Sequence, residues 1–169
     1  MTLRLATKSD LPRLEKMFAK IVENLEKNNI NIYWSEFYPF EEFENDIENK
    51  NLYLIVDGDK IVSALGVFDN LSGQDCFEWK DKSAKAVYLA RLGVNVEYLR
   101  QGIGALMLEK AKEIAREKGV QYIRLLVVDI NTPAIKLYEK CGYNKVKGIF
   151  RDNIFDDIYI SEIGYEIKI

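Results

Sequence analysis

The most constraining feature of this chain is an apolar run that ends in a glycine turn and continues as a helix. Residues 86–95 have the composition of a strand, Gly102 and Gly104 lie in the turn, and an apolar stripe continues to Lys118. The first amides of a helix have no partner within it, and the positive end of the helix dipole lies there. Glycine leaves room for a ligand to approach these amides. The pattern predicts a phosphate-bearing ligand held by main chain.

Strand and helix signals alternate along the rest of the chain. Apolar runs predict strands over 3–6, 52–56, 61–68, 86–95, 122–128, 143–150 and 158–169. Apolar residues at helical spacing predict helices that begin near residues 11, 40, 102 and 132. The order β-α-α-β-β-β-α-β-α-β-β predicts an α/β domain with a mixed sheet. A length of 169 residues favours a single domain over residues 1–169.

Charge and hydropathy exclude some partners. The formal net charge is −3 and the pI is about 5.2, which argues against nucleic acid as the main partner. The apolar runs have the length of strands, so we expect no membrane span. The first residues, Met1 to Leu5, lack the apolar core of a signal peptide, so we expect a cytoplasmic location.

The absence of histidine removes several chemistries. Without it, histidine bases and histidine-ligated metals are excluded. Cys76 and Cys141 lie 65 positions apart and show no metal-ligand spacing, so we expect no metal. Acid–base work would fall to Tyr, Asp, Glu, Lys, Cys or water.

Three interpretations compete for the glycine turn. A dinucleotide-binding turn needs a third glycine where Met107 stands. A P-loop needs a lysine followed by serine or threonine at the start of the helix, and the chain has neither there. A tight turn that binds no ligand is the third possibility.

A second group of residues follows the next predicted strand. Asn131 stands just before a helix that opens with Thr132-Pro133, and Tyr138 comes seven residues later. Seven residues are about two helical turns, so both side chains can face the same side. Taken alone, a tyrosine on a short helix such as Tyr138 is more often a core aromatic residue whose hydroxyl reaches water.

Together, the two motifs resemble those of the GNAT superfamily of N-acetyltransferases, which transfer an acetyl group from acetyl-CoA to an amine. The matching residues are Leu92-Gly93-Val94-Asn95 with Leu99 to Gly104, and Asn131, Ala134, Tyr138 and Gly142-Tyr143. The resemblance covers nearly the whole chain. It departs at Leu99, where Arg or Gln is usual, although Arg100 follows. It implies a mostly antiparallel sheet of about six or seven strands with helices on both faces.

The resemblance also implies a coenzyme site for acetyl-CoA as co-substrate, without metal. The two central strands, 86–95 and 122–128, would splay apart, and Gly93 would lie at a bulge. Main chain near Leu92 and Val94 would pair with the pantetheine arm, and Asn131 would bind it from the other side. The positions assigned to the coenzyme are Leu92, Gly93, Val94, Leu99, Arg100, Gln101, Gly102, Ile103, Gly104, Ala105, Asn131, Ala134 and Tyr138.

The implied reaction is direct attack of a neutral amine on the thioester. Tyr138 is the expected acid to the leaving thiolate, since a phenol near pKa 10 can donate to a thiolate. The base is not identified by the sequence. Glu36, Glu78, Asp129 and a chain of water molecules are all compatible with that role.

An aromatic segment after the first helix is the expected acceptor site. Trp34 and Tyr38 stand on either side of Glu36, and aromatic rings beside a carboxylate can receive a cationic amine. A hydrophobic clamp that closes the end of the sheet is an equally good interpretation. The expected partner is the amine of a small molecule or a peptide, and the expected assembly is a monomer or homodimer. The alternative to an enzyme is a non-catalytic module that binds or senses acyl-CoA.

Overall fold

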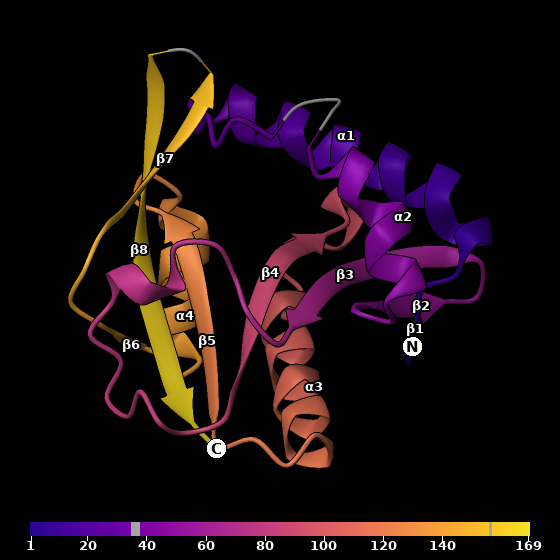
Figure 1. Ribbon diagram of the computed structural model, residues 1–169. Helices are drawn as coiled ribbons and strands as arrows, with labels where there is room; N and C mark the ends of the chain where they lie inside the picture. The colour runs from indigo at the N-terminus through magenta and orange to yellow at the C-terminus, as the bar shows by residue number, and fades with distance from the viewer. Residues whose placement is uncertain (35–37, 156) are drawn as a thin grey trace. The chain divides into compact units, whose positions relative to one another are not determined.

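The computed structural model describes residues 1–34, 38–155 and 157–169 (Figure 1). Its strands are β1 (Thr2–Leu5), β2 (Leu52–Asp57), β3 (Lys60–Phe68), β4 (Ala86–Val94), β5 (Tyr122–Val128), β6 (Asn144–Lys145), β7 (Phe150–Phe155) and β8 (Ile158–Lys168). Its helices are α1 (Leu11–Lys27), α2 (Phe40–Glu48), α3 (Ile103–Glu117) and α4 (Thr132–Lys140). Short 3-10 turns cover Lys8–Asp10, Gln74–Cys76 and Val96–Tyr98. Among the described residues, none of the helices is long and apolar enough to cross a membrane.

The strands pair in the order β1-β2-β3-β4-β5-β8-β6, and β7 pairs with β8. The β4–β5 pair is parallel, whereas β1–β2, β2–β3, β5–β8, β6–β8 and β7–β8 are antiparallel. The expected mixed, mostly antiparallel sheet is confirmed. It has eight strands in the described residues, because the strand expected over 143–150 is interrupted. Gly148 has φ +126°, which breaks the extended conformation, so the segment forms only β6 and the start of β7.

The chain divides into two compact units. The first contains Met1–Val67 and Arg91–Lys110, and the second contains Phe68–Ala90 and Ala111–Ile169. The elements β3, β4 and α3 each contribute residues to both units. Since each unit is made of two chain segments, the single domain expected over residues 1–169 stays a prediction.

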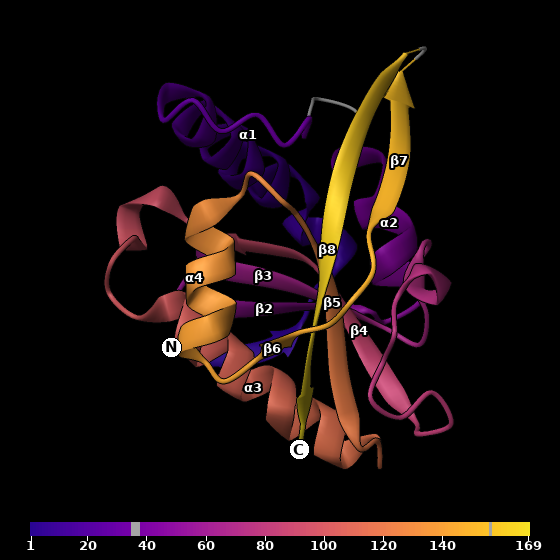
Figure 2. The same cartoon turned by 90° about the vertical axis from the view of Figure 1, so that its left-hand side faces the viewer.

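In the first unit, α1 and α2 pack on one face of β2 and β3. Their buried side chains form a cluster with alternate residues of the strands. The cluster contains Leu14, Phe18, Phe43, Ile47, Leu52, Leu54 and Ala64. The rings of Phe18 and Phe43 make an edge contact with centroids 4.9 Å apart, which fixes α1 against α2. Figures 1 and 2 show α1 on this face and the first turns of α3 on the other, as expected for helices on both faces.

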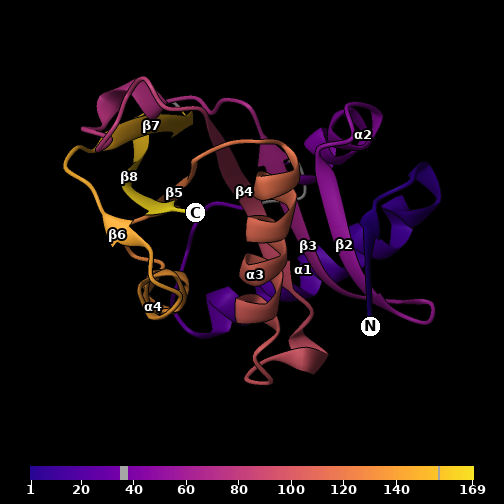
Figure 3. The ribbon, with the colours of Figure 1, turned by 90° about the horizontal axis from the view of Figure 1, so that it is seen from below.

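In the second unit, β8 separates two different environments. The ring of Tyr165 lies 6.3 Å from that of Tyr138, and its hydroxyl donates to Glu139 of α4 at 2.9 Å. A Cβ added to the next residue back, Gly164, would lie 2.7 Å from the ring of Phe77. Alternate residues of a strand point to opposite faces, so odd-numbered residues of β8 point to the α4 face and even-numbered ones to the Phe77 face. Figure 3 shows α4 and the turn at Gln74–Cys76 on opposite sides of β8.

A buried ion pair stabilises the Phe77 face. Arg124 of β5 is 3% exposed, and its Nε lies 3.3 Å from an oxygen of Glu166. The other carboxylate oxygen of Glu166 accepts from the Lys80 amide at 2.8 Å, and the guanidinium lies 5.0 Å from the centre of the Trp79 ring. Desolvated charges require such partners. The segment from 70 to 85 reads as a polar loop in the sequence, yet it supplies Phe77 and Trp79 to this core.

Candidate coenzyme and acceptor site

The glycine turn connects the end of β4 to α3. Asn95 fixes its start, because its side chain accepts from the Glu97 amide at 3.1 Å and donates to the Ile61 carbonyl at 2.9 Å. Arg100 and Gly102 then have φ values of +61° and +79°, in the left-handed region. The amide of Leu106 donates to the Gly102 carbonyl at 3.0 Å. The amides before Leu106 in α3 therefore precede the first helical hydrogen bond, which is the arrangement that binds anions.

The space in front of Gly102 is open. A Cβ added there would meet no atom within 4 Å, so glycine is required by its φ and not by a neighbouring group. The side chains of Leu99 and Arg100 are exposed, whereas that of Ile103 is buried and anchors the helix. Gln101 donates from its side chain to the Glu97 carbonyl at 3.2 Å, which ties the turn to the preceding segment. The two remaining positions of the turn, Gly104 and Ala105, are half-buried.

The bulge expected at Gly93 stays a prediction, and a change of backbone conformation lies two residues earlier in β4. Arg91 is the residue of β4 with a left-handed φ, +56°. Gly93 is needed for a different reason, because a Cβ there would lie 2.7 Å from Cζ of Phe18. The Gly93 carbonyl accepts from the buried Ser63 hydroxyl at 2.7 Å. The adjacent positions assigned to the coenzyme, Leu92 and Val94, are half-buried.

The side chain of Arg91 ties β4 to α2. Its Nε lies 3.1 Å from the buried carboxylate of Asp46, and its Nη2 lies 3.5 Å from Glu42. Burial raises the pKa of Asp46 to about 6, although the charge of Arg91 acts in the opposite direction. The guanidinium also lies over the ring of Tyr38, 5.6 Å from its centre. The strained backbone of Arg91 is thus compensated by three side-chain contacts.

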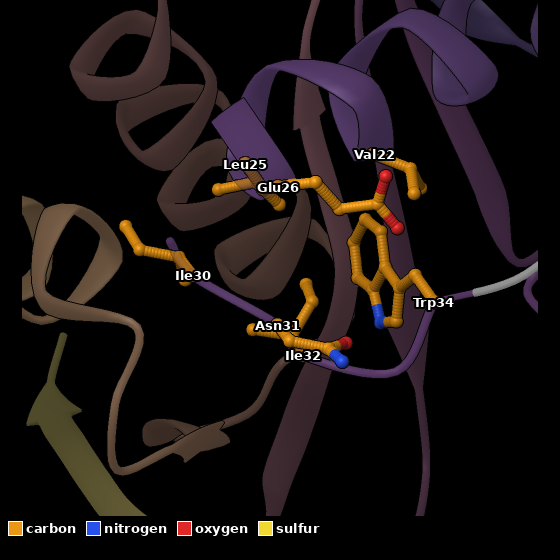
Figure 4. A pocket seen from close by; sticks show the side chains of 7 residues that line it. All are labelled: Val22, Leu25, Glu26, Ile30, Asn31, Ile32 and Trp34. Carbon is orange, nitrogen blue, oxygen red and sulfur yellow. The ribbon is translucent and has the colours of Figure 1, made fainter. Parts of the chain in front are cut away.

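The predicted acceptor segment is partly built into the core. The ring of Trp34 lies 5.5 Å from that of Phe18 and 6.3 Å from that of Tyr38. Trp34 also lines a small pocket with six other residues, and Figure 4 shows the Glu26 carboxylate directed toward its indole ring. The pocket is lined by Val22, Leu25, Glu26, Ile30, Asn31, Ile32 and Trp34. Glu36 lies outside the described residues.

In the second unit, Asn131 and Tyr138 occupy the two ends of α4. The side-chain oxygen of Asn131 caps the helix by accepting from the Ala134 amide at 3.4 Å. Tyr138 is 8% exposed and packs against the rings of Tyr143 and Tyr165, at centroid distances of 5.9 and 6.3 Å. Burial raises the pKa of Tyr138 above its ordinary value. The phenol is therefore protonated at neutral pH and can donate a hydrogen bond.

The parallel pairing of β4 with β5 stops before either strand ends. It extends from Ala86↔Tyr122 to Leu89↔Leu125, after which β4 continues to Val94 and β5 to Val128. The last residues of β5 remain paired with β8. Ending the ladder early leaves main-chain groups of a strand available to another partner.

The carboxylates named as possible bases lie in different surroundings. Glu78 and Asp129 are exposed, and their backbone amides donate to Lys147 and Ser161. Sequence reasoning missed Glu162, which is half-buried on β8 in register with Val128. The available signal was the change in the numbering of the isoleucines in this strand, which are even-numbered up to Ile160 and odd-numbered from Ile163.

Among the described residues, no group of three or more Cys, Asp or Glu side chains is placed to hold a metal ion. The first unit contains the helix terminus that can bind an anion and the pocket beside Trp34, and the second unit contains the buried phenol of Tyr138.

The sheet and its helices define a fold of the mixed α/β class, with a mostly antiparallel sheet. The model of the acetyltransferase (GNAT) family matches residues 19–143. The chain therefore belongs to the GNAT acetyltransferase family.

Individual relatives agree with this assignment. Thialysine N-ε-acetyltransferase of Bos taurus is 39% identical over 64 residues, which are 38% of this chain and 36% of that protein. The chain thus spans little more than a third of the length of the curated relatives it matches first. A GNAT-family acetyltransferase of Streptococcus agalactiae has the same fold, with a TM-score of 0.80 at 14% identity over 98% of this chain and 93% of that chain. YncA of Salmonella typhimurium, solved with its cofactor acetyl-CoA, gives 0.70 at 14% identity over 99% and 93%.

Proposed function

We propose that this protein is an N-acetyltransferase that transfers the acetyl group of acetyl-CoA to a primary amine of a small molecule or peptide. The observation that carries the proposal is the left-handed Gly102 turn before α3, with open space where a Cβ of Gly102 would stand, in a chain of this family. Such a turn offers main-chain amides to a pyrophosphate. We further propose that it acts in the cytoplasm as a monomer or homodimer.

The coenzyme would bind largely through backbone. The amides from Arg100 to Ala105 would hold the pyrophosphate, and the exposed Arg100 side chain would add a positive charge. Main chain at Leu92 and Val94 would pair with the pantetheine arm, because β4 continues past its last pair with β5. The side-chain oxygen of Asn131 already caps α4, so its amide nitrogen is the group that would donate to the arm.

Tyr138 would act on the leaving sulfur. Its hydroxyl is protonated over the working pH range because burial raises its pKa. Burial also makes the phenol a weaker acid, so a hydrogen bond to the sulfur comes first and proton transfer follows as negative charge develops. The same buried surroundings would raise the pKa of the coenzyme thiol, so that the thiolate takes up the proton of Tyr138 more readily.

The acceptor would be recognised beside Trp34. The ring of Tyr38 already contacts the Arg91 cation, which leaves the indole of Trp34 as the better surface for an ammonium group. Glu26 lines the same pocket and would supply the opposite charge. Within the acceptor segment, Trp34 would therefore contact the acceptor, whereas Tyr38 contacts Arg91.

The decisive experiment measures coenzyme binding and turnover on the same protein. Acetyl-CoA at 100 times its Kd should stabilise the fold by about 2.7 kcal/mol in thermal unfolding, and coenzyme A without the acetyl group serves as comparison. A thiol reagent then follows coenzyme release with a panel of primary amines. Binding and amine-dependent release support the proposal. Binding without release on any amine would indicate an acyl-CoA sensor, and no stabilisation would exclude both functions.

A further inference from the structure

Beside the end of β5, the neighbouring strand β8 carries a carboxylate on the face away from α4. Glu162 of β8 lies in register with Val128 of β5 and with Phe150 of β7. It is an even-numbered residue of β8 and therefore points to the Phe77 face, whereas Tyr138 lies on the α4 face. Glu162 and Tyr138 thus lie on opposite faces of β8. Glu162 is in register with Val128 at the end of β5, and the ring of Tyr138 packs against Tyr165, which is in register with Leu125.

The surroundings of Glu162 are apolar and negatively charged. Phe77, Trp79 and Tyr88 form the buried cluster of this face, with Leu126 and Phe150 packed against it. Asp152 of β7 points to the same face because it follows Phe150 by two residues. Farther along β8, Glu166 is already paired with Arg124. Within the described residues, the Glu162 carboxylate has neither an ion pair nor a hydrogen bond.

We propose that Glu162 is the general base, which takes the proton from the acceptor amine as its nitrogen attacks. This role rests on the acetyl transfer proposed above. The amine would approach the acetyl carbon from the Phe77 face, and the sulfur would leave toward the α4 face. The two proton transfers would then take place on opposite sides of the reacting carbon. Glu162 and Tyr138 have this arrangement within one unit of the protein.

The electrostatics support the assignment. Burial, and to a smaller extent the charge of Asp152, raise the pKa of Glu162 to about 7. A carboxylate with this pKa accepts protons near neutral pH, as a general base must. Glu78 and Asp129 are exposed and have no comparable surroundings.

The step balances without any further reactant. The acceptor ammonium first releases one proton to solvent. The lone pair of the neutral nitrogen then forms the C–N bond to the acetyl carbon, and one N–H proton passes to the Glu162 carboxylate. The C–S bond breaks, the sulfur keeps the electron pair, and Tyr138 donates its proton to it. Glu162 then returns one proton to solvent and Tyr138 recovers one. The products are the acetylated amine and coenzyme A with a free thiol.

The test is the pH dependence of kcat/KM for three variants. Glu162→Gln should lower kcat/KM about 100-fold and abolish the decline in kcat/KM below pH 7. Asp152→Asn should stay active and shift that decline to lower pH, because removing a like charge lowers the pKa of Glu162. Asp157→Asn, which removes an exposed carboxylate from the same hairpin, should match the wild type.

Three results would overturn the assignment. An unchanged kcat/KM and pH profile in Glu162→Gln would exclude Glu162 as the base while leaving the proposed function intact. If Glu162→Gln is also no longer stabilised by acetyl-CoA, the pH profile of Asp152→Asn tests the role instead. A decline in kcat/KM at the same pH as in the wild type then excludes Glu162 as the base. A wild-type protein that binds acetyl-CoA but releases no thiol with any amine refutes the proposed function itself, and the base role with it.

Discussion

At the residue scale, a comparison of two glycines with similar backbones distinguishes the effect of backbone strain from an effect on ligand binding. Gly102 and Gly58 have φ values of +79° and +57°, and an added Cβ meets no atom within 4 Å at either position. Gly58 lies in the β2–β3 hairpin, and Gly102 lies in the turn before α3. Alanine at either position should cost about 1 kcal/mol of stability, because both demand a left-handed backbone.

Only one of these substitutions should affect coenzyme binding. We predict that Gly102→Ala raises the Kd of acetyl-CoA about tenfold, since a methyl group then stands between the phosphate and the helix amides. Gly58→Ala should leave this Kd unchanged. Calorimetric titration of both variants, with their melting temperatures, provides the comparison. Equal Kd values in the two variants would show that the turn does not hold the phosphate.

Tyr138 allows a similar comparison within its aromatic cluster. Tyr138→Phe should lower kcat about 100-fold while the Kd of acetyl-CoA changes little, because only the donor to sulfur is lost. Tyr165→Phe is the matched control, since it removes a neighbouring hydroxyl that bonds to Glu139. It should lower stability and leave kcat near the wild-type value. Turnover by Tyr138→Phe at the wild-type rate would limit this residue to packing.

At the element scale, the contact of α1 with β4 depends on the missing side chain of Gly93. We predict that Gly93→Ala destabilises the protein by about 2 kcal/mol, because the new methyl group would overlap the ring of Phe18. Combining it with Phe18→Leu should cost less than the sum of the two single changes, by about 1 kcal/mol. Urea unfolding of the four proteins gives the coupling. Strict additivity would mean that α1 does not press on β4 at this point.

The sequence predicted the positions of helices and strands better than the residues at which their regular backbone is interrupted. The strand at 122–128 and the helix from Thr132 to Lys140 follow the predicted limits, because apolar runs, an N-cap and proline define them locally. The strand expected over 143–150 was wrong, since the backbone of Gly148 interrupts it. No local signal marks Arg91 as left-handed, because its conformation depends on Asp46 in a distant helix.

The residues of the candidate site likewise differ in whether a local sequence pattern or a contact between distant residues indicates them. The glycine turn, Asn131 and Tyr138 could be predicted from the sequence because their spacing is local and repeats a family pattern. Glu162 could not be proposed from the sequence, because the argument for it depends on burial and on Asp152 in a different strand. Trp34 was found as an aromatic residue, but its pocket partner Glu26 lies on α1 and does not stand beside it in the sequence.

At the scale of the whole molecule, the connectivity argues for one cooperative fold. The chain passes between the two compact units after residues 67, 90 and 110, and these crossings lie within β3, β4 and α3. Separating the units would therefore require breaking two strands and a helix. We predict a single thermal transition whose calorimetric and van't Hoff enthalpies agree. Two resolved transitions in scanning calorimetry would contradict a single domain.

The Arg91 contact has a consequence for protein engineering. A new acceptor preference would most simply be sought by grafting the segment that contains Trp34 and Tyr38, together with α2, from another family member. The graft would remove Asp46 and Glu42 from the guanidinium and leave a strained arginine in β4 without its counter-charges. The acceptor segment and residue 91 should therefore be exchanged together, as one module.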